Sequence, residues 1–119
     1  MIADTPEELI LENRIMLVPA LEHWTSGHVA LIGDAAHGLS PHLSAGGTLG
    51  IEDVTVLRAA VQTFPQLQEA LAHYERRRKA RFVRVREFAD AIQQASVPSE
   101  FAQAYGSFSH WMVSTAPGE

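Results

Sequence analysis

The chain has 119 residues, of which 46% are hydrophobic, and this suits one domain with an ordinary core. A net charge of −5 argues against a general nucleic-acid binder, and the lack of cysteine excludes disulfides and thiolate metal sites. The acidic start has no signal-peptide pattern, and no apolar run approaches the roughly 20 residues of a membrane span, so we expect a cytoplasmic protein without membrane contact.

The first half of the chain predicts short strands and a structured loop. Residues 15–18 are a plausible short strand that Pro19 ends. Residues 28–33 are apolar and partly β-branched, which predicts a buried strand of a parallel sheet. Residues 34–47 are rich in glycine, alanine and serine, and Pro41 bars a regular helix there.

Three helices should follow this loop. The first is expected at 48–63, with Gly50, Val54, Leu57 and Val61 along one face. The second, at 66–94, is the longest. It keeps a three-or-four spacing in a stripe of mostly apolar residues, which are Leu67, Leu71, Tyr74, Arg78, Phe82, Val85, Phe88 and Ile92. Pro98 interrupts the pattern, and a short helix is expected at 99–112. The fold class is therefore an α/β fragment that is predominantly helical.

The junction of strand, loop and helix has the chemistry of an anion site. The first turn of a helix leaves backbone N–H groups unpaired and carries a partial positive charge. Gly46 and Gly47 at the helix start allow a flat ligand to approach the main chain closely. Asp34 follows the strand directly, where its carboxylate can accept hydrogen bonds from sugar-like hydroxyls or stabilise the turn. No P-loop and no dinucleotide glycine fingerprint occurs in the chain.

The segment VALIGDAAHGLSPHLSAGGTLGIEDVTVL resembles the second FAD-binding motif of flavin monooxygenases of the para-hydroxybenzoate hydroxylase type. The motif elements are Gly33 to His37, Pro41, Gly46 and Ile51 to Asp53, in ungapped register. Trp24 and the run ALAHYERRRKARFVRV resemble the same family, so the likeness covers nearly the whole chain. The resemblance implies the C-terminal portion of an FAD/NAD(P)-binding domain.

That likeness implies a set of cofactor-binding residues at the ribityl and isoalloxazine side of FAD. Asp34 would bond a ribityl hydroxyl, and Pro41 would lie beside the isoalloxazine ring. Backbone amides around the start of the helix would face the pyrimidine edge of the flavin. Ala45 and Thr48 replace the glutamine and asparagine usual in the family, so two side-chain amide contacts are lost. The implied set is Gly33, Asp34, Pro41, Ala45, Gly46, Gly47 and Thr48.

The resemblance also implies an FAD-dependent monooxygenase, with NADPH or NADH as reductant and an aromatic small molecule as substrate. The family's motifs for the ADP half of FAD have no counterpart here, so we expect the isolated chain to be a truncated piece that cannot turn over. Its partner would be a complementary N-terminal FAD-binding chain or a second copy of itself. The alternative is a non-catalytic interaction module derived from such a domain.

Several other side chains have competing interpretations. Asp34, His37 and His42 could converge on a metal, although a further ligand is not obvious. Seven of the nine positive residues lie between Arg76 and Arg86, where a solvated or ion-paired helix face is expected. The pair Glu52 and Asp53 is explained by the helix dipole without a catalytic role. His42 and Leu43 are the residues expected nearest to a substrate.

Overall fold

The computed structural model describes residues 17–39, 43 and 45–117. The chain is predominantly helical in this part, as the sequence predicts. The elements in chain order are β1 (Thr25–Ser26), β2 (Val29–Ala30), α1 (Asp34–His37), α2 (Gly46–Thr63), α3 (Leu67–Gln94) and α4 (Pro98–Ser114). The helices expected at 48–63, 66–94 and 99–112 correspond to α2, α3 and α4.

The strand expected at 28–33 differs from the prediction. Residues 29 and 30 form β2, which pairs antiparallel with β1 through a turn at Gly27, where φ is 58°. Val29 is 62% exposed and Ile32 is 41% exposed, so a buried parallel strand is wrong for this chain as it stands. A buried parallel strand needs a parallel neighbour and cover on both faces of the sheet, and the only strand that the described residues offer β2 is the antiparallel β1. Of the strand expected at 15–18, residues 17 and 18 are irregular and the others lie outside the described residues.

Helices α2 and α3 are antiparallel neighbours joined by a short turn at Phe64 and Pro65. Phe64 is extended and ends α2, and the residue before a proline is biased away from helix. The face of α2 that is buried differs from the expected one by about a third of a turn. Val54 and Val61 are half exposed, whereas the buried residues are Leu49, Glu52, Asp53, Val56 and Ala60.

Helix α3 is the centre of the fold. Its buried residues are Ala70, Leu71, Tyr74, Arg78, Phe82, Val85 and Ile92, and all except Ala70 lie in the predicted stripe. Helix α4 begins with Pro98 at its first turn and packs on the C-terminal half of α3. Aromatic contacts join the two helices, with Phe88 lying 5.6 Å from Phe108 and 5.3 Å from Trp111 between ring centroids.

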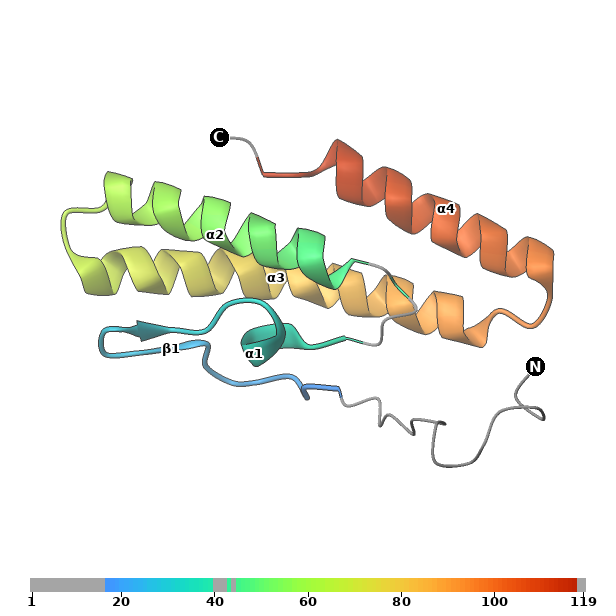
Figure 1. The fold of residues 1–119 in the computed structure, drawn as a ribbon, viewed down its shortest axis with the longest axis horizontal. Helices are drawn as coiled ribbons and strands as arrows, with labels where there is room; N and C mark the ends of the chain where they lie inside the picture. Colours follow the sequence, from blue (N-terminus) through green and yellow to red (C-terminus); the bar gives the residue numbers. More distant parts are fainter. Residues whose placement is uncertain (1–16, 40–42, 44, 118–119) are drawn as a thin grey trace, which may run out of the picture.

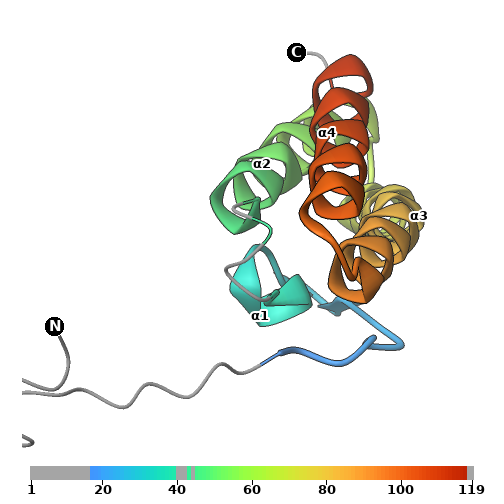
Figure 2. The same cartoon turned by 90° about the vertical axis from the view of Figure 1, so that its right-hand side faces the viewer.

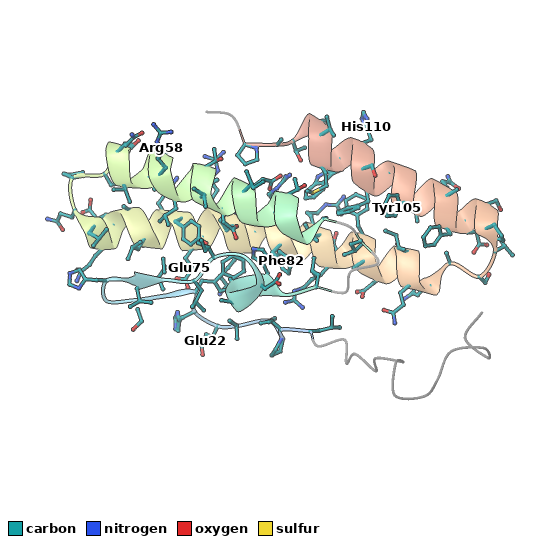
Figure 3. All side chains as sticks on the ribbon, viewed as in Figure 1. Glu22, Arg58, Glu75, Phe82, Tyr105 and His110 are labelled. Carbon is teal, nitrogen blue, oxygen red and sulfur yellow. The ribbon has the colours of Figure 1, made fainter. Side chains whose placement is uncertain are left out.

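The N-terminal described residues cover α3 on the side opposite α4 (Figure 1). In the turned view of Figure 2, α1 lies below α2, away from the C-terminal end of α4. Figure 3 shows Phe82 on the side of α3 that faces α1. The start of α2 and the short helix α1 therefore lie side by side against α3. Among the described residues, no helix is long and apolar enough to cross a membrane.

Candidate functional site

A tight turn at Gly33 joins β2 to α1. Gly33 has φ 57° and ψ −142°, a conformation that residues with a β-carbon rarely adopt. Its carbonyl oxygen accepts hydrogen bonds from the N–H groups of Ala36 and His37, both at 3.0 Å. Asp34 is exposed and begins α1, so the turn presents this carboxylate to solvent.

The segment that leads into the turn is held by side chains from α2 and α3. The Tyr74 hydroxyl donates to the carbonyl of Leu31 at 2.6 Å, and the Gly33 N–H donates to Asp53 Oδ2 at 2.9 Å. Burial raises the pKa of Tyr74 strongly, and the negative charge of Asp53 raises it further. Tyr74 is therefore a neutral hydroxyl donor, and the path of the chain before Asp34 depends on two side chains far away in sequence.

Asp53 lies at the centre of a buried cluster. Besides the Gly33 N–H, it accepts hydrogen bonds from His37 Nε2 at 2.5 Å and from Arg78 Nε at 2.6 Å. Burial alone would raise the pKa of Asp53. The bonds from His37, Gly33 and Arg78, with the charge of Arg78, outweigh burial and lower that pKa below its ordinary value of 3.8. Asp53 is therefore ionised, and His37 carries a proton on Nε2.

Glu52 completes the cluster on its outer side. Arg78 donates to Glu52 at 3.1 Å and to the carbonyl of Leu49 at 3.2 Å. Arg81 binds both carboxylate oxygens of Glu52, at 2.5 Å and 2.8 Å. Two carboxylates and two guanidinium groups thus compensate one another, which buried charges require. Glu52 and Asp53 lie beyond the first turn of α2 and are ion-paired in the interior, so the helix dipole does not explain them.

The start of α2 lies beside the exposed carboxylate. Ala45 is the N-cap residue and makes no side-chain capping bond, and the first turn contains no acidic residue. The first backbone amides of α2, from Gly46 to Thr48, therefore have no side-chain acceptor among the described residues. A β-carbon placed on Gly46 would lie 3.8 Å from Asp34 Oδ1, so the carboxylate and the helix end are close neighbours. Within the described part of the chain, the result is an exposed acceptor next to backbone donors that have no side-chain partner.

The structure brings together most residues of the predicted cofactor site. Gly33, Asp34 and Gly46 border one small area, and Gly47 and Thr48 continue it as exposed residues of α2. The side chain of Ala45 is buried beneath them. Pro41 and His42 lie outside the described residues.

The sequence also predicts that Leu43 lies near a substrate and offers a metal site in this loop as an alternative. Leu43 was expected near a substrate, but its side chain is buried in the core, and its carbonyl accepts a hydrogen bond from Tyr105 at 3.2 Å. Leu43 is therefore a packing residue. In the part of the chain that the structure describes, no three metal-ligating side chains gather, and His37 faces Asp53.

The buried cluster was missed by sequence reasoning, although a signal for it exists. Arg78 occupies a position in the apolar stripe of α3, where a charged side chain needs a buried partner. The spacing of Leu49, Asp53, Val56 and Ala60 likewise indicates a second helical face that contains one carboxylate. An arginine and a carboxylate on facing stripes of neighbouring helices predict the pair that is observed.

Comparisons with known proteins show the family of the chain. Residues 16–89, more than half of the chain, match the family described as FAD binding domain. The chain is 29% identical over 112 residues to aurachin C monooxygenase/isomerase of Stigmatella aurantiaca, covering 94% of this chain and 28% of that protein. It is 38% identical over 71 residues to hispidin-3-hydroxylase of Neonothopanus nambi, covering 57% and 17%.

A third relative is kynurenine 3-monooxygenase of Drosophila willistoni, 48% identical over 48 residues, covering 40% of this chain and 10% of that protein. The chain thus spans between 10% and 28% of the length of these relatives. No solved structure matches it significantly. The motif from Gly33 to Asp53 lies inside the matched range, and the chain belongs to the FAD binding domain family of the FAD-dependent monooxygenases.

Proposed function

We propose that this chain supplies the ribityl and isoalloxazine side of the FAD site of a monooxygenase. The observation that carries the proposal is the exposed Asp34 carboxylate beside the glycine-rich start of α2. A carboxylate accepts hydrogen bonds from sugar-like hydroxyls, and free amides donate to carbonyl oxygens. A ribityl chain and the pyrimidine edge of a flavin present these two kinds of group next to each other.

The arrangement of the residues fits this side of the cofactor. Gly46 and Gly47 leave the first turn of α2 open, so a flat ring can reach the main chain. The helix end favours negative charge, which reduced flavin carries at this edge of the ring. Bound FAD supplies the redox chemistry, and the protein positions it. We place Pro41 beside the ring, as the family resemblance implies.

We assign the remaining parts of the reaction to polypeptide outside these 119 residues. The three relatives are several times longer than the chain, and they are named as a monooxygenase/isomerase, a hydroxylase and a monooxygenase. Groups for the ADP half of FAD, for NADPH or NADH and for an aromatic substrate are expected there. The chain alone should therefore bind FAD weakly and catalyse no hydroxylation.

A second candidate function is that of a binding module for such a complementary chain. It is favoured by the apolar residues that remain exposed on α2 and β2, which include Ile51 at 71%, Val54 at 50% and Val29 at 62%. Large exposed apolar patches mark interaction sites. The occupant we propose is the sheet-bearing remainder of an FAD binding domain, because it would give β2 the neighbouring strands that it lacks here.

Equilibrium titration with FAD, followed by flavin fluorescence, tests the proposed function. We expect binding weaker than about 1 µM, equivalent to about 8 kcal/mol, since half of the cofactor has no protein partner. Asp34→Ala should weaken binding further. Asp90→Ala is the matched control, because Asp90 is an exposed carboxylate on a different helix, α3, and is not among the proposed site residues.

Two outcomes would contradict the proposal. Equal FAD affinity of the wild type and Asp34→Ala would remove the carboxylate from the site. Submicromolar binding by the isolated chain would show that it holds more of the cofactor than the ribityl and isoalloxazine side.

A further inference from the structure

The three donors to Asp53 come from two segments that are both distant from it in the sequence. Gly33 and His37 lie 20 and 16 residues before it, and Arg78 lies 25 residues after it. Asp53 has no exposed surface, and Arg78 and His37 are almost fully buried. Because an unpaired charge is costly in the interior, these partners constrain one another strongly.

The contacts of Asp53 bracket the residue proposed to hold the flavin. The Gly33 N–H is bonded immediately before Asp34, and the His37 side chain is bonded at the other end of α1. A helix of four residues has no stability of its own, so its orientation depends on contacts from outside. Asp53 provides two of them from one carboxylate.

The His37 ring is itself held in place. It stacks on Phe82 with 4.7 Å between ring centroids and lies 5.3 Å from the Trp24 ring. On the other side of the carboxylate, Arg78 is fixed by Glu52 and by the carbonyl of Leu49. Asp53 therefore connects two rigid parts of the molecule, the aromatic contacts around His37 and the α2–α3 helix pair.

We propose that Asp53, supported by Arg78, is a positioning residue for the flavin site. It locks the Gly33 turn and α1 so that the Asp34 carboxylate lies beside the start of α2. This inference rests on the proposed role of Asp34 in binding the ribityl chain. Asp53 itself does not touch the cofactor in this assignment, and its effect on binding passes through the turn.

Glu52→Gln is the matched control for Asp53→Asn. Both variants remove one buried carboxylate charge from the partners of Arg78, but only Asp53 contacts Gly33 and His37. The experiment measures amide hydrogen exchange of the whole chain by NMR, together with the dissociation constant for FAD. Gly47, an exposed residue in the first turn of α2, is the reference amide.

In the wild type we expect the Gly33 amide to exchange more slowly than that of Gly47. Asp53→Asn should abolish this protection and raise the FAD dissociation constant roughly tenfold or more, as loss of a partner that orients a ligand does. Glu52→Gln should keep both properties. If Asp53 only stabilised the fold, both substitutions would lower global stability, and the two variants would have equal FAD dissociation constants.

Four results would be informative in different ways. Retained protection of Gly33 in Asp53→Asn, or unchanged FAD affinity in that variant, overturns the proposal. If Asp53→Asn does not fold, fast exchange of Gly33 in the wild type overturns it and slow exchange supports it. If the wild type binds no FAD, the proposed function fails, while the exchange of Gly33 still decides whether Asp53 holds the turn.

Discussion

At the scale of single residues, the backbone conformation requires glycine at position 33 but not at position 47. Gly33 needs its positive φ, so any β-carbon there would be strained although the surrounding space is open. Gly47 is helical, and a β-carbon on it would also meet no atom within 4 Å. Glycine in a helix is usually less stable than alanine. Stability therefore does not explain the glycine at 47, whereas the proposed access of FAD to the main chain would require it.

Gly47→Ala should raise the free energy of unfolding by up to about 1 kcal/mol, because alanine loses less backbone entropy on folding. The same change should weaken FAD binding, since a methyl group would stand at the open helix start. Urea denaturation and FAD titration measure the two effects. Gly106→Ala in α4, which also has open space, is the control and should leave FAD binding unchanged. Unchanged FAD binding in Gly47→Ala would contradict this use of the glycine.

Asp53 also predicts a dependence of stability on pH. Its pKa is lowered in the folded chain, so the unfolded chain, with an Asp pKa of about 3.9, binds the proton more readily. The stabilisation is complete above that unfolded value and is lost as pH falls through it toward the folded pKa.

Asp53→Asn should therefore cost about 3 kcal/mol at pH 7, the loss expected when one partner of a buried pair is removed. Its unfolding free energy should also fall less than that of the wild type between about pH 5 and pH 2. Urea denaturation over this range measures both. Asp90→Asn controls for the loss of one negative charge. A parallel pH dependence of Asp53→Asn and the wild type would refute the ionised, paired state of Asp53.

At the scale of elements, Arg81 connects α2 with the end of α4. It binds Glu52 on α2, donates to Thr115 Oγ1 at 2.7 Å and to the Met112 carbonyl at 3.3 Å, and its guanidinium lies 4.5 Å from the Trp111 ring centroid. The last carbonyls of a helix lack partners within the helix. Arg81 supplies one from α3 and so fixes the end of α4 to the helix pair.

Arg81→Gln should increase amide exchange over the last turn of α4 and lower the free energy of unfolding by about 3 kcal/mol, because it leaves Glu52 without a bidentate partner. Arg76→Gln is the control, since Arg76 is exposed on the same helix, and it should change stability by at most about 0.5 kcal/mol. Equal effects of the two substitutions would show that Arg81 is an ordinary surface residue.

The sequence predicts the helical elements well because their signals are local. Apolar spacing, Pro65 and Pro98 define where α2, α3 and α4 begin and end, and the structure agrees to within about two residues. The motif also contains both Asp34 and the start of α2 at Gly46 within one short segment of the chain. These features need no information about distant segments.

What the sequence could not provide was the pairing of distant residues. Val54 and Val61 have the apolar spacing of a buried face, but the face that contains Asp53 is buried because Arg78 compensates its charge. The strand at 28–33 has the composition of an interior strand, yet among the described residues it has only the antiparallel β1 as a neighbour. In both cases the outcome was decided by partners outside the local pattern.

At the scale of the whole molecule, α2 has two apolar faces and only one of them is covered. Ile51, Val54 and Val61 lie on the other and are about half exposed or more. Sites of this kind on a monomer promote association. We therefore expect the protein to self-associate in solution unless a complementary chain covers this face of α2.

Sedimentation should show concentration-dependent self-association of the wild type, because the uncovered face buries apolar surface when two copies meet. Ile51→Lys combined with Val54→Glu should shift the chain toward monomer. The control is Val113→Glu, at a valine on α4 that is 81% exposed. A strictly monomeric wild type, or an equal response to Val113→Glu, would contradict a role for this face.

NMR mapping tests most directly whether this chain holds one defined half of FAD, as we propose. Titration of the nitrogen-15-labelled chain with FMN, which has the ribityl and isoalloxazine groups, is compared with titration by ADP. We predict that FMN shifts the amide signals of Gly33, Asp34, Gly46, Gly47 and Thr48, and that ADP leaves them unchanged. Equal shifts with ADP, or no shift at these amides with FMN, would contradict the claim.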